Sequence, residues 1–502
     1  MDLFGFELSE VRVFLIIFIG TAILMRVVMY FLWARTLPPG PMGLPIIGNL
    51  HQLGKNPHKT MASFARKYGN VYMIHFGSRP TVVLSDYETV REAMIKHGDD
   101  FAGRPDFQSF QYINEGKGVA FSPHYDARWK LLRKIMVNAA RLLVNDKKRP
   151  IDANILDECD TLIKELLSTN GQPIDPRIPI KMCVGSIIFT LVFGESIASR
   201  EDQDFKDMIE SSRKFTAFQA SGGNIADIMP WTKIFTKKRL QEFIELIDEN
   251  QKLHQRKHKE HVLTYNQEDL RDITDALIKA SRDVRKIENM VDLDERFILT
   301  LTGEFIGAGF NTVSTFMHWA VLYMASYPKI QSKVHAEISA VIGDGRQPQI
   351  GDKINMKYTE ACILEINRKS SLTPMALPHA TTCDTTLNGY TIPAKTLTFI
   401  NLWALHHDET TWGDPENFRP ERFLDKDGEI IQELAEKVVA FGLGRRRCLG
   451  EFIAKLELFL LLTRTLQRCE FAIPEGVTPN MEGVYGLALD PAPFDVTITP
   501  RD

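Results

Sequence analysis

Contrasting hydrophobic patterns follow one another along the chain. Residues 11–33 are almost wholly apolar, and such a run is about long enough to cross a bilayer as a helix. Residues 71–85 hold two β-rich runs around a Gly-Ser-Arg-Pro turn, which predicts a hairpin. Residues 387–400 and 494–498 carry similar β-branched alternation, whereas the middle of the chain has helical periodicity with charged faces. We therefore predict a mainly α-helical fold with a small β region.

The apolar run at residues 11–33 has the features of a retained membrane anchor. A signal peptide would have a shorter apolar core and a small-residue cleavage site, whereas this run ends at the bulky Tyr30 and Trp33. Acidic residues precede the run and Arg35 follows it, which places the rest of the chain in the cytosol under the positive-inside rule, although Arg12 weakens the asymmetry.

A proline-rich and glycine-rich segment follows the predicted anchor. Prolines fix φ and restrict the residue before them, so this segment should be stiff and non-helical. The resulting division is a membrane anchor over residues 1–36, a Pro/Gly-rich hinge over residues 37–49, and one large globular domain over residues 50–502.

Composition narrows the classes of partner and compartment. The formal net charge is −4 and no basic repeat is present, so nothing points to nucleic acid. The six cysteines are far apart and form no disulfide-framework pattern, which suits a reducing compartment. They are Cys159, Cys183, Cys362, Cys383, Cys448 and Cys469.

A long apolar stretch without proline, residues 295–326, predicts one central helix. It contains Gly303, Gly307 and Gly309. Each glycine in a helix costs about 1 kcal/mol relative to alanine, so this clustering needs a packing or functional reason.

The stretch at residues 441–450, Phe-Gly-Leu-Gly-Arg-Arg-Arg-Cys-Leu-Gly, runs into a helical pattern that extends to about residue 466. A cysteine is a strong ligand or nucleophile only as the thiolate, which a helix N-terminus beside cations favours. Three arginines precede Cys448. A buried structural cysteine after a Gly-rich loop is the alternative interpretation.

Five positions of this stretch match the signature Phe-x-x-Gly-x-Arg-x-Cys-x-Gly: Phe441, Gly444, Arg446, Cys448 and Gly450. In this the chain resembles a cytochrome P-450, a haem-thiolate monooxygenase. The resemblance implies the triangular fold of that family, with a long central helix over the haem, and haem b (iron protoporphyrin IX) whose axial ligand is the Cys448 thiolate. It also implies that Phe441 packs by the sulfur, that Arg446 reaches a propionate, and that Gly450 leaves room for the flat ring. Residues 50–502 would form the haem-thiolate catalytic domain.

The resemblance implies further contacts to the haem. Trp129 and Arg133 lie four apart, so on a helix they share a face and could address one propionate. His379 would supply another propionate donor, and Ala308 and Gly309 would leave space above the iron. The plainer alternatives are a core tryptophan beside a solvated arginine, and a bystander histidine.

Glu365 and Arg368 form a Glu-x-x-Arg pair, and Arg422 lies in the downstream Pro-Glu-Arg-Phe. Such i, i+3 pairs are usually surface features. The resemblance implies instead a buried Glu-Arg-Arg network with a structural role.

Residues of the central helix would take part in oxygen activation. The resemblance implies that Thr312 holds a water that delivers protons. Asn311 stands where many members have Asp or Glu, and an amide cannot donate and recover a proton as a carboxyl group does. We therefore hypothesise impaired coupling of electrons to product, or another proton route with Glu304 as the candidate.

The substrate would be a small lipophilic molecule in an aromatic-lined pocket. The implied contacts are Phe121, Phe215, Phe218, Phe305, Met375, Leu377 and Leu487. Some segments are similar to steroid 17-alpha-hydroxylase/17,20-lyase, and others, among them Gly307 to Phe310 and Asn224 with Asp227, to the aromatic-hydrocarbon hydroxylases. The choice between a steroid and a planar aromatic or xenobiotic substrate stays open.

The chain has no dinucleotide or flavin motif, so an electron donor must be a separate protein. The resemblance implies NADPH-cytochrome P-450 reductase, with cytochrome b5 as an additional partner, at the endoplasmic reticulum membrane. Arg128, Lys130, Arg133, Lys134 and Arg445 to Arg447 would form a basic docking patch. The alternatives are a reductase-independent haem-thiolate isomerase or dehydratase, and a non-catalytic haem gas sensor.

Overall fold

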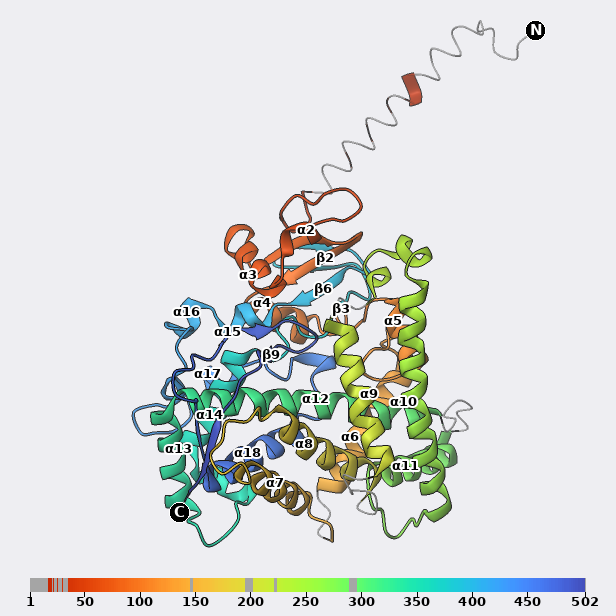
Figure 1. The fold of residues 1–502 in the computed structure, drawn as a ribbon. Helices are drawn as coiled ribbons and strands as arrows, with labels where there is room; N and C mark the ends of the chain where they lie inside the picture. Colours follow the sequence, from red (N-terminus) through yellow and green to blue (C-terminus); the bar gives the residue numbers. More distant parts are fainter. Residues whose placement is uncertain are drawn as a thin grey trace, which may run out of the picture.

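The computed structural model describes residues 35–144, 148–194, 202–220, 224–288 and 296–501, with a few positions between 17 and 29. Helices dominate this part of the chain, and the strand-rich region lies at the end of the molecule that the red and orange segments form (Figure 1). The prediction of a mainly α-helical fold with a small β region is confirmed.

The longer helices enclose a large apolar core. They are α3 (Pro57–Tyr68), α6 (Ala127–Val144), α7 (Ile151–Leu167), α8 (Arg177–Phe193), α9 (Gln203–Ala220), α10 (Lys237–Thr264), α11 (Ile273–Glu288), α12 (Arg296–Ser326), α13 (Pro328–Val341), α14 (Lys357–Ser370) and α18 (Glu451–Arg468). The short helical segments are α2 (Leu50–Leu53), α4 (Tyr87–Arg91), η1 (Glu92–Lys96), α5 (Gln108–Tyr112), η2 (Ile113–Gly116), η4 (Ile225–Asp227), η5 (Pro230–Ile234), η6 (Ile350–Asn355), α15 (Leu402–His406), α16 (Glu409–Trp412), η7 (Pro420–Phe423), α17 (Gln432–Lys437) and η8 (Gly444–Arg446).

The strands form one four-stranded sheet and three two-stranded pairs in the described residues. They are β1 (Val71–Phe76), β2 (Arg79–Leu84), β3 (His379–Ala380), β4 (Thr385–Leu387), β5 (Tyr390–Ile392), β6 (Leu397–Ile400), β7 (Cys469–Ala472), β8 (Gly483–Val484), β9 (Asp490–Pro491) and β10 (Thr497–Pro500). The order of the larger sheet is β1-β2-β6-β3.

The predicted hairpin at residues 71–85 is confirmed. β1 and β2 pair antiparallel, from Val71 opposite Leu84 to Phe76 opposite Arg79. β6 then joins β2 in parallel, so a segment more than 300 residues away completes the sheet. The strand expected at 494–498 begins later, at Thr497, because its partner β7 ends at Ala472, opposite Thr497. Val496 instead forms an isolated bridge with Ile174.

α12 runs across the middle of the molecule (Figure 1). It packs against α8, α10, α14 and α18, and most of its side chains are buried. Each fully buried large apolar side chain stabilises the fold by roughly 1.5–3 kcal/mol. Phe316 and Trp319 are among those on α12 that are almost wholly buried. The predicted central helix is therefore present, apart from Glu295, which lies outside the described residues.

The Pro/Gly-rich segment lies along the sheet. The carbonyl oxygen of Pro39 accepts the backbone N–H of Met73 at 2.8 Å, and the backbone N–H of Asn49 donates to His75 at 2.8 Å. A Cβ added at Gly40 would lie 1.8 Å from the Met73 carbonyl oxygen, so only glycine allows this approach.

The anchor predicted at residues 11–33 lies largely outside the described residues. Among the residues that the structure does describe, no helix combines the length and apolar character needed to cross a bilayer.

Candidate functional site

The loop at residues 441–450 leads to the N-terminal end of α18 and holds Cys448 there. The backbone N–H of Cys448 donates to the carbonyl oxygen of Phe441 at 2.8 Å, which closes the loop on itself. Gly444 has a φ of 73°, and an added Cβ would lie 2.0 Å from the carbonyl oxygen of Met94. Glycine is therefore required at 444. A Cβ added at Gly450 would meet no described atom within 4 Å, so space is left in front of α18.

The Cys448 side chain is accessible although protein encloses it on most sides. Burial raises the pKa of its thiol, and this outweighs the backbone N–H of Gly450 and the charges of Arg133 and Arg447, which lower it. The neighbouring arginines thus favour the thiolate as expected, but in the polypeptide alone burial has the larger effect on the pKa. A bound metal cation would stabilise the thiolate, because a coordinating thiol is deprotonated outright.

The arginines before Cys448 point to different partners. Arg445 is exposed and pairs with Asp99 at 2.8 Å, and exposed Arg447 pairs with Glu451 at 2.5 Å. Arg446 turns inward, where its guanidinium donates to the carbonyl oxygens of Ala102, Val119, Ser122 and His124. Only Arg446 therefore faces the interior.

Arg446 belongs to a group of cations at one edge of the site. Its guanidinium lies 4.2 Å from the ring centre of Trp129, and that of Arg133 lies 5.6 Å from the same ring. Arg133 donates to the carbonyl oxygen of Arg447 at 2.6 Å. The predicted shared face of Trp129 and Arg133 on α6 is present, and the Trp129 indole N–H donates to the Val119 carbonyl oxygen at 2.9 Å.

Arg104 completes this cation group, and sequence reasoning missed it. It is buried and donates to the carbonyl oxygens of Ala120, Leu377 and Pro378. Burial and the charges of Arg446 and Arg133 push its pKa well below the usual range. Nothing in the local sequence distinguishes Arg104 from a surface arginine.

His379 lies against the same group. Its Nδ1 is 2.8 Å from the carbonyl oxygen of Phe101, so Nδ1 carries the proton. Burial, then the charges of Arg104 and Arg446, hold the pKa of His379 well below its usual value.

The hydrogen bonds of these cations go to backbone carbonyls, and in the part of the chain that the structure describes none of them is paired with a carboxylate. Like charges crowded together without a direct ion pair form a site that an anion would stabilise. The two propionates of a haem are such anions, and Cys448 is accessible on the neighbouring loop. The residues present therefore fit this cofactor.

An accessible notch interrupts the buried surface of α12. Gly307, Ala308 and Thr312 are exposed, Gly309 and Asn311 are half-buried, and the flanking residues are buried. A Cβ at Gly307 would meet nothing within 4 Å, whereas one at Gly309 would lie 2.7 Å from Cδ1 of Ile188 in α8. A side chain at position 309 would therefore displace the end of the Ile188 side chain, whereas open space lies at Gly307.

Thr312 and Asn311 make different contacts. The Thr312 hydroxyl donates to the carbonyl oxygen of Ala308 at 2.7 Å, which leaves its lone pairs free to accept a hydrogen bond from water. The Ser212 hydroxyl of α9 donates to Oδ1 of Asn311 at 3.1 Å. Asn311 thus joins α12 to α9.

Glu304 connects α12 to the loop at residues 118–122. Its Oε2 accepts the backbone N–H of Val119 at 2.9 Å, and Oε1 accepts that of Ala120 at 3.0 Å. A Cβ at Gly118 would lie 2.0 Å from Oε1, so glycine allows this contact. Burial raises the pKa of Glu304 to about 7, against the two backbone hydrogen bonds, which lower it. Because both oxygens are engaged, this geometry favours a positioning role over proton delivery.

Glu365, Arg368 and Arg422 form a buried network. Arg368 donates to both oxygens of Glu365, at 2.7 and 2.8 Å, and Arg422 lies 3.2 Å from the same carboxylate. The side chains of Glu365 and Arg368 are completely buried. Arg368 also donates to the carbonyl oxygens of His406 and Pro415, which fixes the chain before the Cys448 loop.

The residues predicted to contact substrate are spread over several environments. Phe121 packs with Phe110 of α5 at 4.7 Å between ring centres. Phe215 and Phe218 of α9 have their rings near Phe243 of α10, at 6.3 and 4.9 Å. They therefore take part in helix packing. The others are Phe305 and Met375, which are buried, Leu377, which is half-buried, and Leu487, which is 45% exposed.

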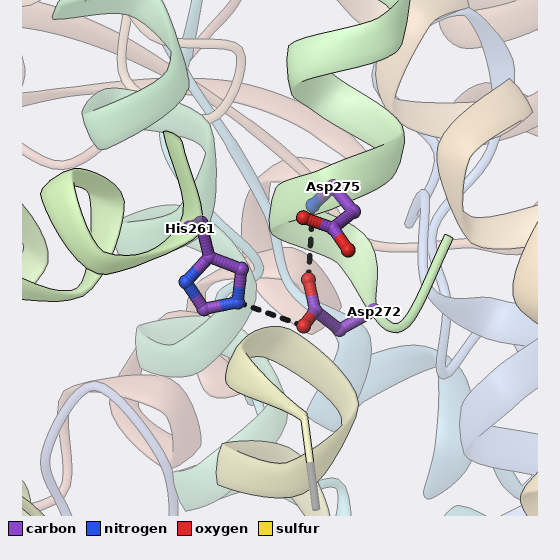
Figure 2. A group of neighbouring side chains, drawn as sticks. All are labelled: His261, Asp272 and Asp275. Carbon is purple, nitrogen blue, oxygen red and sulfur yellow. Dashed lines mark hydrogen bonds and ion pairs between the residues drawn. The ribbon is translucent and has the colours of Figure 1, made fainter. Parts of the chain in front are cut away.

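A separate group of ionisable side chains lies where α10 meets α11. Figure 2 shows His261, Asp272 and Asp275, whose ligand atoms all lie within 4.8 Å of one another. Their polar atoms are already engaged: His261 bonds to Asp272 at 2.8 Å, Asp272 accepts the backbone N–H of Asp275 at 2.9 Å, and Asp275 pairs with Arg271. This group is therefore a structural junction between the two helices.

Comparison with known proteins assigns the family. The family model described as Cytochrome P450 matches residues 38–498. The chain is 38% identical to cytochrome P450 1A1 of Felis catus, over 90% of this chain and 89% of the relative. It is 39% identical to cytochrome P450 1A1 of Opsanus tau and 37% identical to cytochrome P450 1A2 of Oryctolagus cuniculus, over 90% of this chain and 88 and 89% of the relatives. The chain belongs to the cytochrome P450 family of monooxygenases, whose cofactor is haem held by a cysteine thiolate.

Proposed function

We propose that this monooxygenase inserts one atom of O2 into a planar aromatic substrate, with electrons from a separate NADPH-dependent reductase. The observation that carries the proposal is the accessible Cys448 beside a group of cations, Arg104, Arg133 and Arg446, whose hydrogen bonds go to backbone carbonyls. A thiolate donor and an anion-binding edge are the two requirements for holding a haem by its iron and its propionates.

Cys448 would hold the iron, and the cations Arg104, Arg133 and Arg446 would hold the propionates. Trp129 and His379, whose N–H groups donate to the carbonyl oxygens of Val119 and Phe101, would lie beside them. When bound, the haem supplies the metal centre at which oxygen is activated. The notch on α12, where Gly307 and Ala308 are exposed, would leave room for oxygen and substrate. The Thr312 hydroxyl, which donates to Ala308, can accept a hydrogen bond from water and so position it as a proton source.

Aromatic rings favour a flat substrate. Phe107, Phe110 and Phe121 form a continuous series, with ring centres 5.1 and 4.7 Å apart, next to the loop that Glu304 fixes to α12. Flat aromatic molecules gain from offset or edge-to-face contact with such rings. The similarity of residues 307–310 and of Asn224 with Asp227 to the aromatic-hydrocarbon hydroxylases supports the same choice over a steroid.

Exposed side chains support a membrane location and a protein electron donor. Trp231, Ile234 and Phe235 are 52, 72 and 80% exposed, and such apolar side chains suit a lipid surface better than water. Lys130 and Lys134 of α6 and Arg445 and Arg447 of the loop before α18 are exposed, which supports an acidic docking partner such as NADPH-cytochrome P-450 reductase, with cytochrome b5 as an additional donor. We place the protein at the endoplasmic reticulum membrane with its catalytic domain in the cytosol.

The test is turnover of the full-length holoprotein with purified reductase, NADPH and labelled O2. Pyrene and progesterone serve as the flat aromatic and the steroid probe. We expect hydroxylated pyrene that carries one labelled oxygen atom, at a rate well above that for progesterone. Oxidation of progesterone alone would reverse the choice of substrate class, and rearrangement of an added organic hydroperoxide without reductase or O2 would favour the isomerase alternative.

A further inference from the structure

Asp227 lies at a junction between the segment after α9 and the short helix α5. Its carboxylate is buried, and both oxygens bond to one residue of α5. Oδ1 accepts the backbone N–H of Ser109 at 3.0 Å, and Oδ2 accepts the Ser109 hydroxyl at 2.6 Å. The side-chain amide of Asn224 lies 3.4 Å from Oδ1 on the other side.

α5 has no cap of its own. The residue before its first turn is Phe107, which has no side chain that can accept a hydrogen bond from the unpaired N–H groups there. Asp227 supplies the acceptor from 118 positions away in the sequence. A helix of five residues is not stable by itself, so its position depends on such contacts.

The segment at residues 225–229 is itself fixed to the β1–β2 hairpin. Ser78 donates its backbone N–H to the carbonyl oxygen of Ile228 at 3.1 Å, and Arg79 donates to the carbonyl oxygen of Asp227 at 2.5 Å. A Cβ at Gly77 would lie 2.5 Å from the Ile228 carbonyl oxygen, so the turn and the segment are in close contact. The backbone of Asp227 is therefore hydrogen-bonded to the β1–β2 hairpin, and its side chain is hydrogen-bonded to α5.

α5 in turn contributes one ring to the aromatic series of Phe107, Phe110 and Phe121. Phe110 of α5 has its ring between those of Phe107 and Phe121, at 5.1 and 4.7 Å. Phe121 follows the loop residues Val119 and Ala120, which Glu304 holds against α12. α5 also packs against α10 at the edge of the molecule (Figure 1). A shift of α5 would therefore move Phe110 relative to a loop that α12 holds in place.

We propose that Asp227 is a positioning residue for substrate specificity: by capping α5 it fixes the aromatic series of Phe107, Phe110 and Phe121 in the arrangement that a flat substrate requires. The proposal rests on the proposed function for the class of substrate. The cap itself is independent of that class and can be measured separately.

The experiment compares full-length holoprotein with variants at this junction. Asp227→Ala removes both acceptors, and Ser109→Ala removes only the hydroxyl bond and keeps the backbone N–H. Asp106→Asn is the matched control, because Asp106 pairs with the same Arg79 at 2.6 Å and is exposed. Amide hydrogen exchange of residues 108–112 reports the cap, and haem spectral titrations with pyrene and with the compact aliphatic adamantane report specificity.

We expect exchange at residues 108–112 to rise about tenfold or more in Asp227→Ala, since a hydrogen bond to a charged group contributes at least about that factor. The Kd for pyrene should rise by a similar factor, Ser109→Ala should lie between this variant and the wild type, and adamantane binding and Asp106→Asn should remain close to the wild type. Unchanged exchange in Asp227→Ala overturns the proposal, as does equal loss of both probes with a lowered Tm. If the wild type does not bind pyrene, the proposed substrate class fails, and the exchange result alone decides whether Asp227 caps α5.

Discussion

Glu304 shows how one buried carboxylate can hold a loop against a helix. Both of its oxygens accept backbone N–H groups, and the absent side chain at Gly118 makes the approach possible. Its pKa is raised from 4.5 to about 7. Between these two values the folded chain binds more protons at this position than the unfolded chain does, so the Glu304 contribution to stability falls as the pH rises.

Replacing Glu304 with Gln should remove this pH dependence. At pH 5 the wild type and Glu304→Gln both have a neutral side chain, and from there to pH 8 the wild type should lose stability relative to the variant, by at most about 1.4 kcal/mol per pH unit. Thermal unfolding of both proteins across this range measures the difference in Tm. A difference in Tm that stays constant from pH 5 to 8 would contradict the assignment.

Arg104 illustrates a residue that pattern alone does not reveal. Its role depends on burial beside Arg446 and Arg133, and both are distant in sequence. Arg104→Gln removes a charge from the anion-binding edge, so we expect haem to leave the protein faster, by about tenfold, the factor that a charge-assisted hydrogen bond contributes. Transfer of haem to an apoprotein acceptor measures this rate. The control is Arg346→Gln, an exposed arginine paired with Asp352, and equal rates in the two variants would refute the role.

At the scale of elements, the local sequence pattern was sufficient to predict a helix or strand where the burial of one face determines its structure. The hairpin at β1 and β2, the long α12 and the shared face of Trp129 and Arg133 on α6 all follow from periodicity or spacing. α5 could not be predicted in this way, because its cap comes from Asp227. The sequence also could not show that a side chain at position 309 would meet α8, since this depends on the position of Ile188.

The Glu365 and Arg368 pair tests the difference between a buried and an exposed pair of the same spacing. Arg368→Met leaves a buried carboxylate with Arg422 as its remaining guanidinium partner, and breaking such a pair costs about 3–5 kcal/mol. We expect little folded, haem-containing protein. The matched control is Arg213→Met, which breaks the exposed i, i+3 pair with Glu210 and should leave haem content unchanged. Equal haem content in the two variants would show that the buried network has no structural role.

At the scale of the whole molecule, the site is assembled from segments that are far apart in the sequence. The cation group alone draws on the loop at Arg104, on α6 and on the loop before α18. The signature around Cys448 identified the ligand loop from sequence, because its spacing is local. The lack of a direct ion pair at these cations among the described residues could not be predicted, since it depends on which carboxylates the fold brings into contact with them.

The central claim is that the thiolate of Cys448 holds the haem iron. The most direct measurement is the spectrum of the reduced, carbon-monoxide-bound holoprotein for the wild type, Cys448→Ser and Cys383→Ser, because Cys383 is the other exposed cysteine among the described residues. We predict the long-wavelength Soret band of a thiolate-ligated haem in the wild type and in Cys383→Ser. We predict its loss in Cys448→Ser, with far-UV circular dichroism as the check on folding. The same thiolate band in a folded Cys448→Ser variant would contradict the account.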